Sequence, residues 1–151
     1  MKRRERLILI VDDSPEDREV VRRYLSRDPL ESYRFLEEST GAEALELCRS
    51  AALDCLLIDY SLPDMDGLEF LQRLIDEDGP PPFPIVMLTG KGSEMIAVQA
   101  LKHGAQDYLV KGQYTSELLH ATIVEAVESF ARRPRRERQR VVSERDQQET
   151  R

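Results

Sequence analysis

Five short strand-like runs, each followed by a helix-like segment, restrict the folds open to this chain more than any other feature. The runs are Leu7–Val11, Tyr33–Glu37, Cys55–Ile58, Ile85–Leu88 and Asp107–Val110. Each is too short for a helix, and the first, third and fourth are mostly aliphatic, as buried strands are. Alternating strands and helices predict an α/β fold, in which helices cover both faces of a doubly wound, five-stranded parallel sheet.

Helix signals occupy the segments between these runs. Ser14 followed by Pro15 is typical of a helix start, and the break at Asp28-Pro29 ends that helix after about Ser26. Four more helices are expected: one capped by Thr40, one over Leu68–Ile75, one from a cap at Ser93 to about His103, and one from about Ser116 to Phe130. The last has a stripe at helical spacing that should be buried. Its members are Leu118, Leu119, Thr122, Ile123, Ala126, Val127 and Phe130.

The charge of the chain is unevenly distributed. The 151 residues carry a net charge of −7, but residues 1–6 carry +3 and residues 132–151 carry +4, which leaves −14 for the stretch between them. A chain of this length suits one domain. We therefore expect a folded domain over residues 6–131 and a basic polar tail or linker over residues 132–151. The acidic body argues against a protein that coats nucleic acid with its whole surface.

Neither membrane insertion nor secretion is expected. The longest apolar run, Leu7–Val11, is far shorter than the roughly 20 residues of a spanning helix, and no signal-peptide pattern is present. Cys48 and Cys55 lack metal-like or redox spacing and are expected to fill the core. His103 and His120 are expected near the surface, without partners. We expect a soluble, cytoplasmic protein.

Functional groups end four of the five strands. Asp12 and Asp13 follow the first, Asp59 the third, Thr89 the fourth and Lys111 the fifth. In an open parallel sheet the ligand site lies at the carboxyl ends of the strands. The predicted fold therefore brings three carboxylates, a hydroxyl and an ammonium group to one edge.

Three crowded carboxylates repel one another unless a cation is present. A hard divalent ion bound by a few oxygens suits Mg²⁺, which usually shares its shell with phosphate. Zinc is not expected, since the strand ends carry neither His nor Cys. A lysine and a hydroxyl beside the metal would face an anion. Together these groups indicate metal-assisted phosphoryl transfer.

These residues resemble the receiver domain of bacterial two-component response regulators, over about residues 6–131. The matching features, in order, are Asp12-Asp13, Asp59, the loop Pro63-Asp64-Met65-Asp66-Gly67, Thr89 and Lys111. The resemblance implies a flavodoxin-like sheet of strand order 2-1-3-4-5. It also implies a signalling switch that catalyses its own phosphorylation and slow dephosphorylation without being a metabolic enzyme.

The resemblance assigns a role to each site residue. Asp59 would accept a phosphoryl group from a phosphohistidine. Asp13, Asp59 and the backbone carbonyl of Ser61 would bind Mg²⁺ directly, with Asp12 acting through water. Lys111 would contact one phosphoryl oxygen and Thr89 another, while Tyr108 turns inward as the switch is activated.

The resemblance also implies partners. These are a sensor histidine kinase or phosphotransfer protein and a downstream protein target, which the switch would contact through the fourth helix, fifth strand and fifth helix. The same face is a candidate homodimer surface. We expect no membrane contact and no direct DNA binding, because no helix-turn-helix or winged-helix pattern follows residue 131.

One position departs from the family pattern. Receiver domains commonly have proline after the lysine, with a cis peptide bond, whereas this chain has Gly112. A cis bond before glycine costs about 2.5–4 kcal/mol. We therefore expect a trans bond or a looser loop after Lys111.

Three alternatives accompany this interpretation. The chain could be the receiver portion of a larger hybrid kinase or effector protein. It could be a docking module that has lost phosphorylation, although every acceptor residue is present. A haloacid-dehalogenase-type phosphatase fits less well, because its first strand should end in Asp-x-Asp and here Asp12 and Asp13 are adjacent. The basic ends could be solvated termini, a connector to a further domain, or a contact for an acidic partner.

Overall fold

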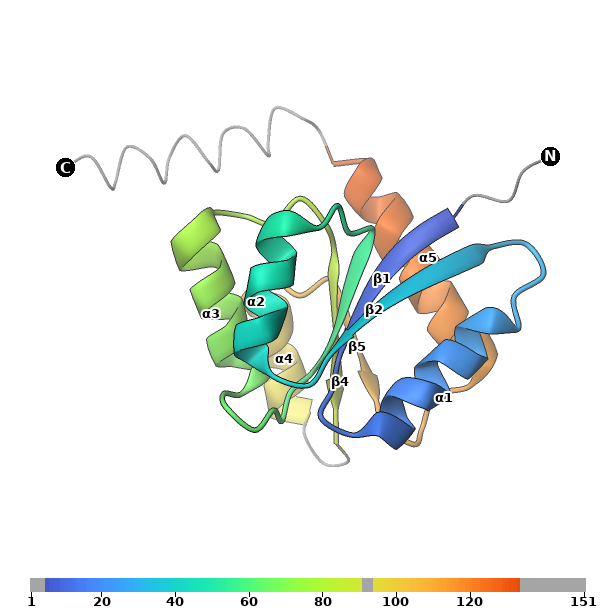
Figure 1. The fold of residues 1–151 in the computed structure, drawn as a ribbon, viewed down its shortest axis with the longest axis horizontal. Coiled ribbons are helices and arrows are strands. Elements are labelled where there is room, and N and C mark those ends of the chain that lie inside the picture. Colours follow the sequence, from blue (N-terminus) through green and yellow to red (C-terminus); the bar gives the residue numbers. More distant parts are fainter. Residues whose placement is uncertain (1–4, 91–93, 134–151) are drawn as a thin grey trace.

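A computed structural model describes residues 5–90 and 94–133. Strands and helices alternate along the chain, as the sequence predicts. They are β1 (Glu5–Val11), α1 (Pro15–Ser26), β2 (Ser32–Glu38), α2 (Gly41–Ser50), β3 (Cys55–Asp59), α3 (Gly67–Asp78), β4 (Ile85–Thr89), α4 (Glu94–Lys102), β5 (Asp107–Val110) and α5 (Ser116–Ala131). All neighbouring strands pair in parallel in the order β2-β1-β3-β4-β5, which confirms the predicted fold class (Figure 1).

Helices cover both faces of the sheet, with α1 and α5 on one side and α2, α3 and α4 on the other (Figure 1). Successive residues of a strand point to opposite faces. Ile8 and Ile10 accordingly pack under α1 and α5, whereas Leu9 and Val11 pack under α2 and α3. Cys48 and Cys55 are both buried, as expected of core residues. None of the helices in the described part of the chain is long and apolar enough to cross a membrane.

Strand β1 begins at Glu5, two residues before the predicted start. The extension includes Arg6, which is only 4% exposed. Its Nε donates to Glu31 Oε2 over 3.0 Å. Because this ion pair neutralises the guanidinium, a charged residue can extend a strand whose other members are mostly apolar.

Helix starts follow the predicted capping chemistry. The Ser14 hydroxyl accepts from the Asp17 amide at the start of α1, and the Thr40 hydroxyl accepts from the Glu43 amide at the start of α2. Helix α4 ends at Lys102, one residue before the predicted end. The predicted cap of α4, Ser93, lies outside the described residues.

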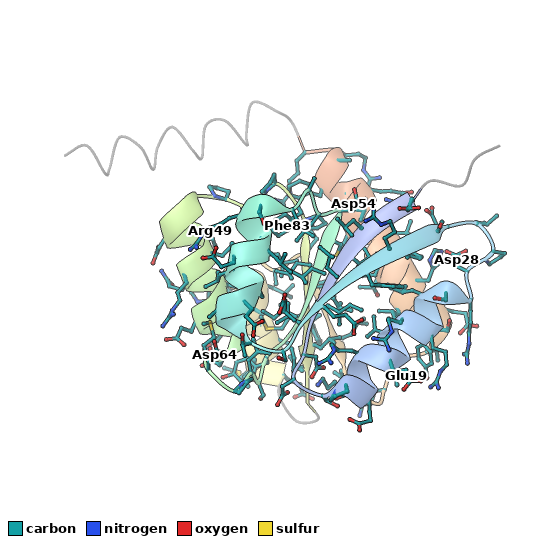
Figure 2. All side chains as sticks on the ribbon, in the orientation of Figure 1. Glu19, Asp28, Arg49, Asp54, Asp64 and Phe83 are labelled. Atoms are coloured by element: carbon teal, nitrogen blue, oxygen red, sulfur yellow. The ribbon has the colours of Figure 1, made fainter. Side chains whose placement is uncertain are left out.

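Two predictions about α5 are wrong. Leu118 is 47% exposed, because it lies beside the buried stripe formed by Leu119, Thr122 and Ile123 and faces outward near β5. His120 does have partners: its Nδ1 lies 2.6 Å from Asp28 Oδ2 and 3.1 Å from the Tyr33 hydroxyl. Asp28 belongs to the connection between α1 and β2 (Figure 2), so the crossing of α5 over that connection creates contacts that helical spacing alone does not reveal.

Candidate functional site

The first two acids of the site extend directly from β1. Asp12 continues the strand pairing, its amide donating to the Glu38 carbonyl over 3.1 Å. It is fully buried, whereas Asp13 is exposed. Asp12 Oδ1 accepts from the Ser14 amide over 3.0 Å, which fixes the carboxylate at the start of α1.

Asp59, the last residue of β3, completes a group of three carboxylates. Since β1 and β3 are neighbours in the sheet, their carboxyl ends place Asp12, Asp13 and Asp59 together. One carboxylate oxygen from each lies within 4.8 Å of the others. Three hard oxygen donors at this spacing fit a divalent cation such as Mg²⁺. The predicted convergence of these acids is confirmed.

Lys111 reaches the same group from the end of β5. Its Nζ lies 2.7 Å from Asp12 Oδ2, 2.9 Å from Asp59 Oδ2 and 2.9 Å from Asp17 Oδ2. The ammonium donates hydrogen bonds to Asp17 and Asp59, and it forms an ion pair with Asp12, whose buried Oδ2 accepts no hydrogen bond among the described residues. The lysine thus holds together acids that would otherwise repel one another.

Burial and charge compete at this edge. Burial raises the pKa of Asp59, the hydrogen bond from Lys111 lowers it, and the charge of Asp12 raises it again, with a net rise. Burial acts to lower the pKa of Lys111, but the contacts that its ammonium makes with the carboxylates of Asp12, Asp17 and Asp59 raise the pKa above its ordinary value. The ammonium therefore stays charged. The ionised form of Asp59 is disfavoured by its surroundings, and an additional cation beside it would stabilise that form.

A tight turn follows Lys111. The Lys111 amide donates to the Thr89 carbonyl over 2.8 Å, and the Gln113 amide donates to the Val110 carbonyl over 3.0 Å. Gly112 has a φ of 77°, a region that residues with a side chain rarely adopt. The described residues contain no cis peptide bond, so the trans bond expected before Gly112 is confirmed.

Thr89 and Tyr108 lie on neighbouring strands, and among the described residues neither side chain takes part in the contacts between Lys111 Nζ and the carboxylates. The buried Thr89 hydroxyl donates to the Leu109 carbonyl over 3.5 Å. Tyr108 pairs with Met87 in the sheet register and packs partly against the core under α2, α3 and α4. In the structure described, no hydrogen bond or ion pair joins either residue to Asp59.

The loop after β3 is held by its own backbone. The Ser61 amide donates to Asp59, and Ser61 forms an isolated bridge with Asp66. Asp66 caps α3 by accepting from the Glu69 amide over 2.8 Å. Met65 packs so closely against Gly41 that a Cβ there would stand 2.5 Å from its sulfur. The loop is therefore fixed beside the carboxylates.

Two acids at this edge make contacts that the sequence did not predict. No motif assigns Asp17 a role at the site, yet its carboxylate accepts a hydrogen bond from Lys111 Nζ. Asp64 accepts from the amides of Gly41 and Ala42 over 2.8 and 3.0 Å and thereby caps α2 from a distant loop (Figure 2). The acid-rich first turn after Asp12-Asp13 is the signal that could have pointed to Asp17.

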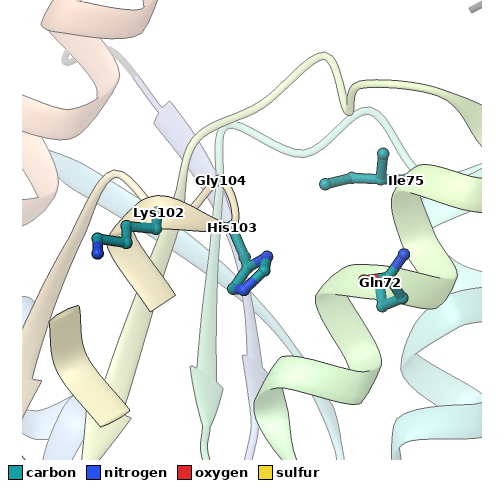
Figure 3. A pocket seen from close by; sticks show the side chains of 5 residues that line it. All are labelled: Gln72, Ile75, Lys102, His103 and Gly104. Atoms are coloured by element: carbon teal, nitrogen blue, oxygen red, sulfur yellow. The ribbon is translucent and has the colours of Figure 1, made fainter. Parts of the chain in front are cut away.

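A hollow of about 380 Å³ lies elsewhere, between α3 and α4 (Figure 3). Its lining residues are Gln72, Ile75, Lys102, His103 and Gly104. His103 is exposed there, as the sequence predicts. Because none of these side chains is a carboxylate, the hollow does not offer the donor set found at the strand ends.

Comparison with known families identifies one match. Residues 8–123 match the model of the response regulator receiver domain. A curated relative, the transcriptional regulatory protein SrrA of Staphylococcus aureus, is 41% identical over 104 residues, which are 69% of this chain and 41% of that protein. The chain thus spans less than half the length of this relative.

Similar solved structures are also those of response regulators and their receiver domains. A putative response regulator from Chloroflexus aurantiacus is 29% identical with a TM-score of 0.71, and the match covers 85% of this chain and all of that one. The receiver domain of the putative response regulator NarL from Mycobacterium tuberculosis is 27% identical, also with a TM-score of 0.71, over 82% of this chain and 97% of that one.

Proposed function

This chain belongs to the response regulator receiver domain family, and on that premise we propose that it is a signalling switch controlled by phosphorylation of Asp59. The observation that carries the proposal is the group formed by Asp12, Asp13, Asp59 and Lys111 at one edge of the sheet. The chain has a regulatory role, and its covalent chemistry serves to set the state of the switch.

The phosphoryl transfer uses Asp59 as nucleophile. A carboxylate oxygen of Asp59 forms a bond to phosphorus while the bond from phosphorus to the donor nitrogen of a phosphohistidine breaks. Lys111 compensates the negative charge that spreads over the phosphoryl oxygens. Attack by water later releases inorganic phosphate and restores the carboxylate, which returns the switch to its original state.

The acidic group fits Mg²⁺. We assign Asp13, Asp59 and the Ser61 carbonyl as direct ligands and Asp12 as a ligand through water. When bound, the metal neutralises charge on the phosphoryl group and on the acids that surround it. Asp12 also orients the start of α1 through the Ser14 amide, so the protein sets the donor positions in advance.

Thr89 and Tyr108 form the proposed switch. The Thr89 hydroxyl, now directed to the Leu109 carbonyl, turns to a phosphoryl oxygen once Asp59 is modified. Tyr108, half-buried on the adjacent strand, then moves inward into the space beside Thr89. Modification at the sheet edge thereby changes the surface of α4, β5 and α5.

We assign the switch to residues 6–131, with residues 132–151 as a basic tail or linker, and place its action in the cytoplasm. Its donor is a sensor histidine kinase or a phosphotransfer protein, and its output is a contact with a downstream protein. The relative from Staphylococcus aureus is named a transcriptional regulatory protein, and this chain matches less than half of it. The proposed output of this chain is contact with protein, without direct binding to DNA.

The output face is apolar enough to pair with a second copy. Met95, Val98 and Leu101 on α4 are 73%, 46% and 42% exposed, and Leu118 on α5 is 47% exposed. Exposed apolar residues gathered on one face mark an interaction surface. Light scattering with and without beryllofluoride, a mimic of the phosphoryl group, measures the outcome. A mass that doubles supports the homodimer, and an unchanged mass removes it.

The central experiment is phosphorylation by a small donor. Wild-type protein incubated with Mg²⁺ and acetyl phosphate should gain one acid-labile phosphoryl group by intact mass, and Asp59→Asn should gain none. Glu19→Gln, a change to an exposed acid on α1 (Figure 2), is the matched control and should be modified like wild type. Wild-type protein that stays unmodified contradicts the proposal.

Two alternatives make different predictions. A haloacid-dehalogenase-type phosphatase would turn over phosphomonoesters continuously, and the match to receiver domains gives that activity no support. The receiver portion of a larger hybrid kinase or effector protein would still be phosphorylated on Asp59. Extending the chain would then add an output activity that responds to the modification.

A further inference from the structure

Resting on the proposed function, we propose that Asp17 is a positioning residue that retains the Lys111 ammonium at the site when a divalent cation occupies the other carboxylates. Asp17 and Lys111 are joined by a hydrogen bond of 2.9 Å between Oδ2 and Nζ. Asp17 is not a member of the acidic group that could bind a metal. It therefore has a separate task at the same edge.

Asp17 is presented by a firmly held helix start. Its amide donates to the Ser14 hydroxyl over 3.2 Å, and the Ser14 amide donates to Asp12 Oδ1 over 3.0 Å. Arg18 Nη1 also donates to the Asp12 carbonyl over 2.6 Å. These contacts tie the first turn of α1 to the end of β1, so the Asp17 carboxylate has a fixed base from which to hold the lysine.

Lys111 is less constrained by its own segment. It precedes Gly112, whose positive φ lets the chain turn without the rigid ring that proline would supply. A cavity of about 200 Å³ adjoins the lysine and gives its side chain room to move. Its lining includes Val20, Tyr24, Leu88 and Tyr114. The position of the ammonium therefore depends mainly on its carboxylate partners.

A divalent cation changes which partners remain. Two of the three carboxylates that contact Lys111, those of Asp12 and Asp59, belong to the group that fits a metal. A metal there competes for the same oxygens and repels the ammonium. Of the three contacts between Lys111 and carboxylates, the one with Asp17 then remains. It holds Nζ at the rim of the site, within reach of an incoming phosphoryl oxygen.

The test measures the phosphorylation rate with acetyl phosphate at saturating Mg²⁺ in wild-type protein and five variants. Asp17→Asn should react about fivefold slower than wild type, the effect of losing one partly exposed charged contact. Glu19→Gln, which removes the same charge from the same helix, should match wild type, and Asp17→Glu should recover part of the rate. In a Lys111→Ala background, Asp17→Asn should slow the reaction no further, because its effect passes through the lysine.

A second readout follows the lysine directly. In protein with ¹³C-labelled lysine, addition of Mg²⁺ should move the Lys111 Cε resonance much further in Asp17→Asn than in wild type, since only the variant releases the ammonium. Equal rates in Asp17→Asn and wild type, equal slowing in the Lys111→Ala background, or equal resonance shifts would each overturn the positioning role. Wild-type protein that is never phosphorylated overturns the proposed function itself, and the role of Asp17 falls with it.

Discussion

Two groups of acidic side chains lie at opposite edges of the sheet, and only one of them is balanced, in the sense that each acid has a partner of its own. At the amino edge Glu31 pairs with Arg6, Asp28 contacts the His120 ring, and Asp54 accepts from the Leu7 amide. At the carboxyl edge, within the described part of the chain, the one ammonium of Lys111 contacts three carboxylates, and Asp13 lies beside them.

This difference between the two edges indicates which edge serves stability and which serves function. Acids that each have their own partner within the fold need nothing further, and their contacts connect elements of the fold. An excess of carboxylates costs free energy in the folded state unless another cation arrives. The unbalanced edge is thus the one prepared to bind a ligand, and four measurements test this difference between the two edges.

Magnesium should stabilise the protein through the unbalanced edge alone. At a concentration about 100 times its dissociation constant, Mg²⁺ should add about 2.7 kcal/mol to the free energy of unfolding. Asp13→Asn should lose most of this gain, while Glu16→Gln, a nearby exposed acid, should keep it. Thermal unfolding at constant ionic strength measures the effect. Equal stabilisation of Asp13→Asn and wild type would contradict the metal assignment.

Breaking the balanced edge should cost stability and leave the chemistry intact. His120→Ala removes the partner of Asp28, whose side chain is only 5% exposed, and should lower the free energy of unfolding by about 2 kcal/mol. His103→Ala, at an exposed histidine, should stay within about 0.5 kcal/mol of wild type. Urea unfolding gives both values. A His120→Ala protein as stable as His103→Ala would show that the cluster contributes little.

Relieving the unbalanced edge should stabilise the metal-free protein. The pKa of Asp59 is raised, so its ionisation opposes folding once the pH exceeds the unfolded value. Asp59→Asn should therefore be about 1 kcal/mol more stable than wild type at neutral pH in the presence of a chelator. The difference should shrink as the pH falls through the raised pKa. A variant less stable than wild type at neutral pH would be the opposite outcome.

Asp64 should show the reverse pH dependence at the same edge. Its slight burial acts to raise its pKa, but the Gly41 and Ala42 amides lower it below the ordinary value. Its contribution is therefore complete above the unfolded pKa and lost as the pH falls through the lower folded one. Asp64→Asn should cost about 0.5 kcal/mol at neutral pH and nothing in strong acid. Thermal unfolding across that pH range provides the measurement.

The sequence predicts the unbalanced edge better than the balanced one. Asp12, Asp59 and Lys111 each follow a strand, and parallel pairing alone brings strand ends together. No such rule applies to Asp28 and His120, which meet because α5 crosses the connection after α1. Contacts of this kind depend on how helices pack, and helical periodicity in one segment does not specify them.

The direction of individual side chains could not be predicted from the sequence either. Asp17 and Lys111 are 94 positions apart, and their contact depends on where a long, flexible side chain turns. Leu118 fits the spacing of a buried stripe, yet it lies outside that stripe because the covered face of α5 is narrower than the apolar pattern. Element bounds were easier, since caps such as Ser14 and Thr40 act within a few residues.

The order of the strands along the chain has a consequence for biosynthesis. Asp12 is made early, and Lys111, the only ammonium that contacts the acids in the described part of the site, directly follows the last strand. A nascent chain that lacks β5 carries the acids without their counter-charge, and its β4 is an uncovered edge of the sheet. Completion of the site therefore coincides with completion of the sheet, so a growing polypeptide gains its chemistry only when almost the whole domain has been synthesised.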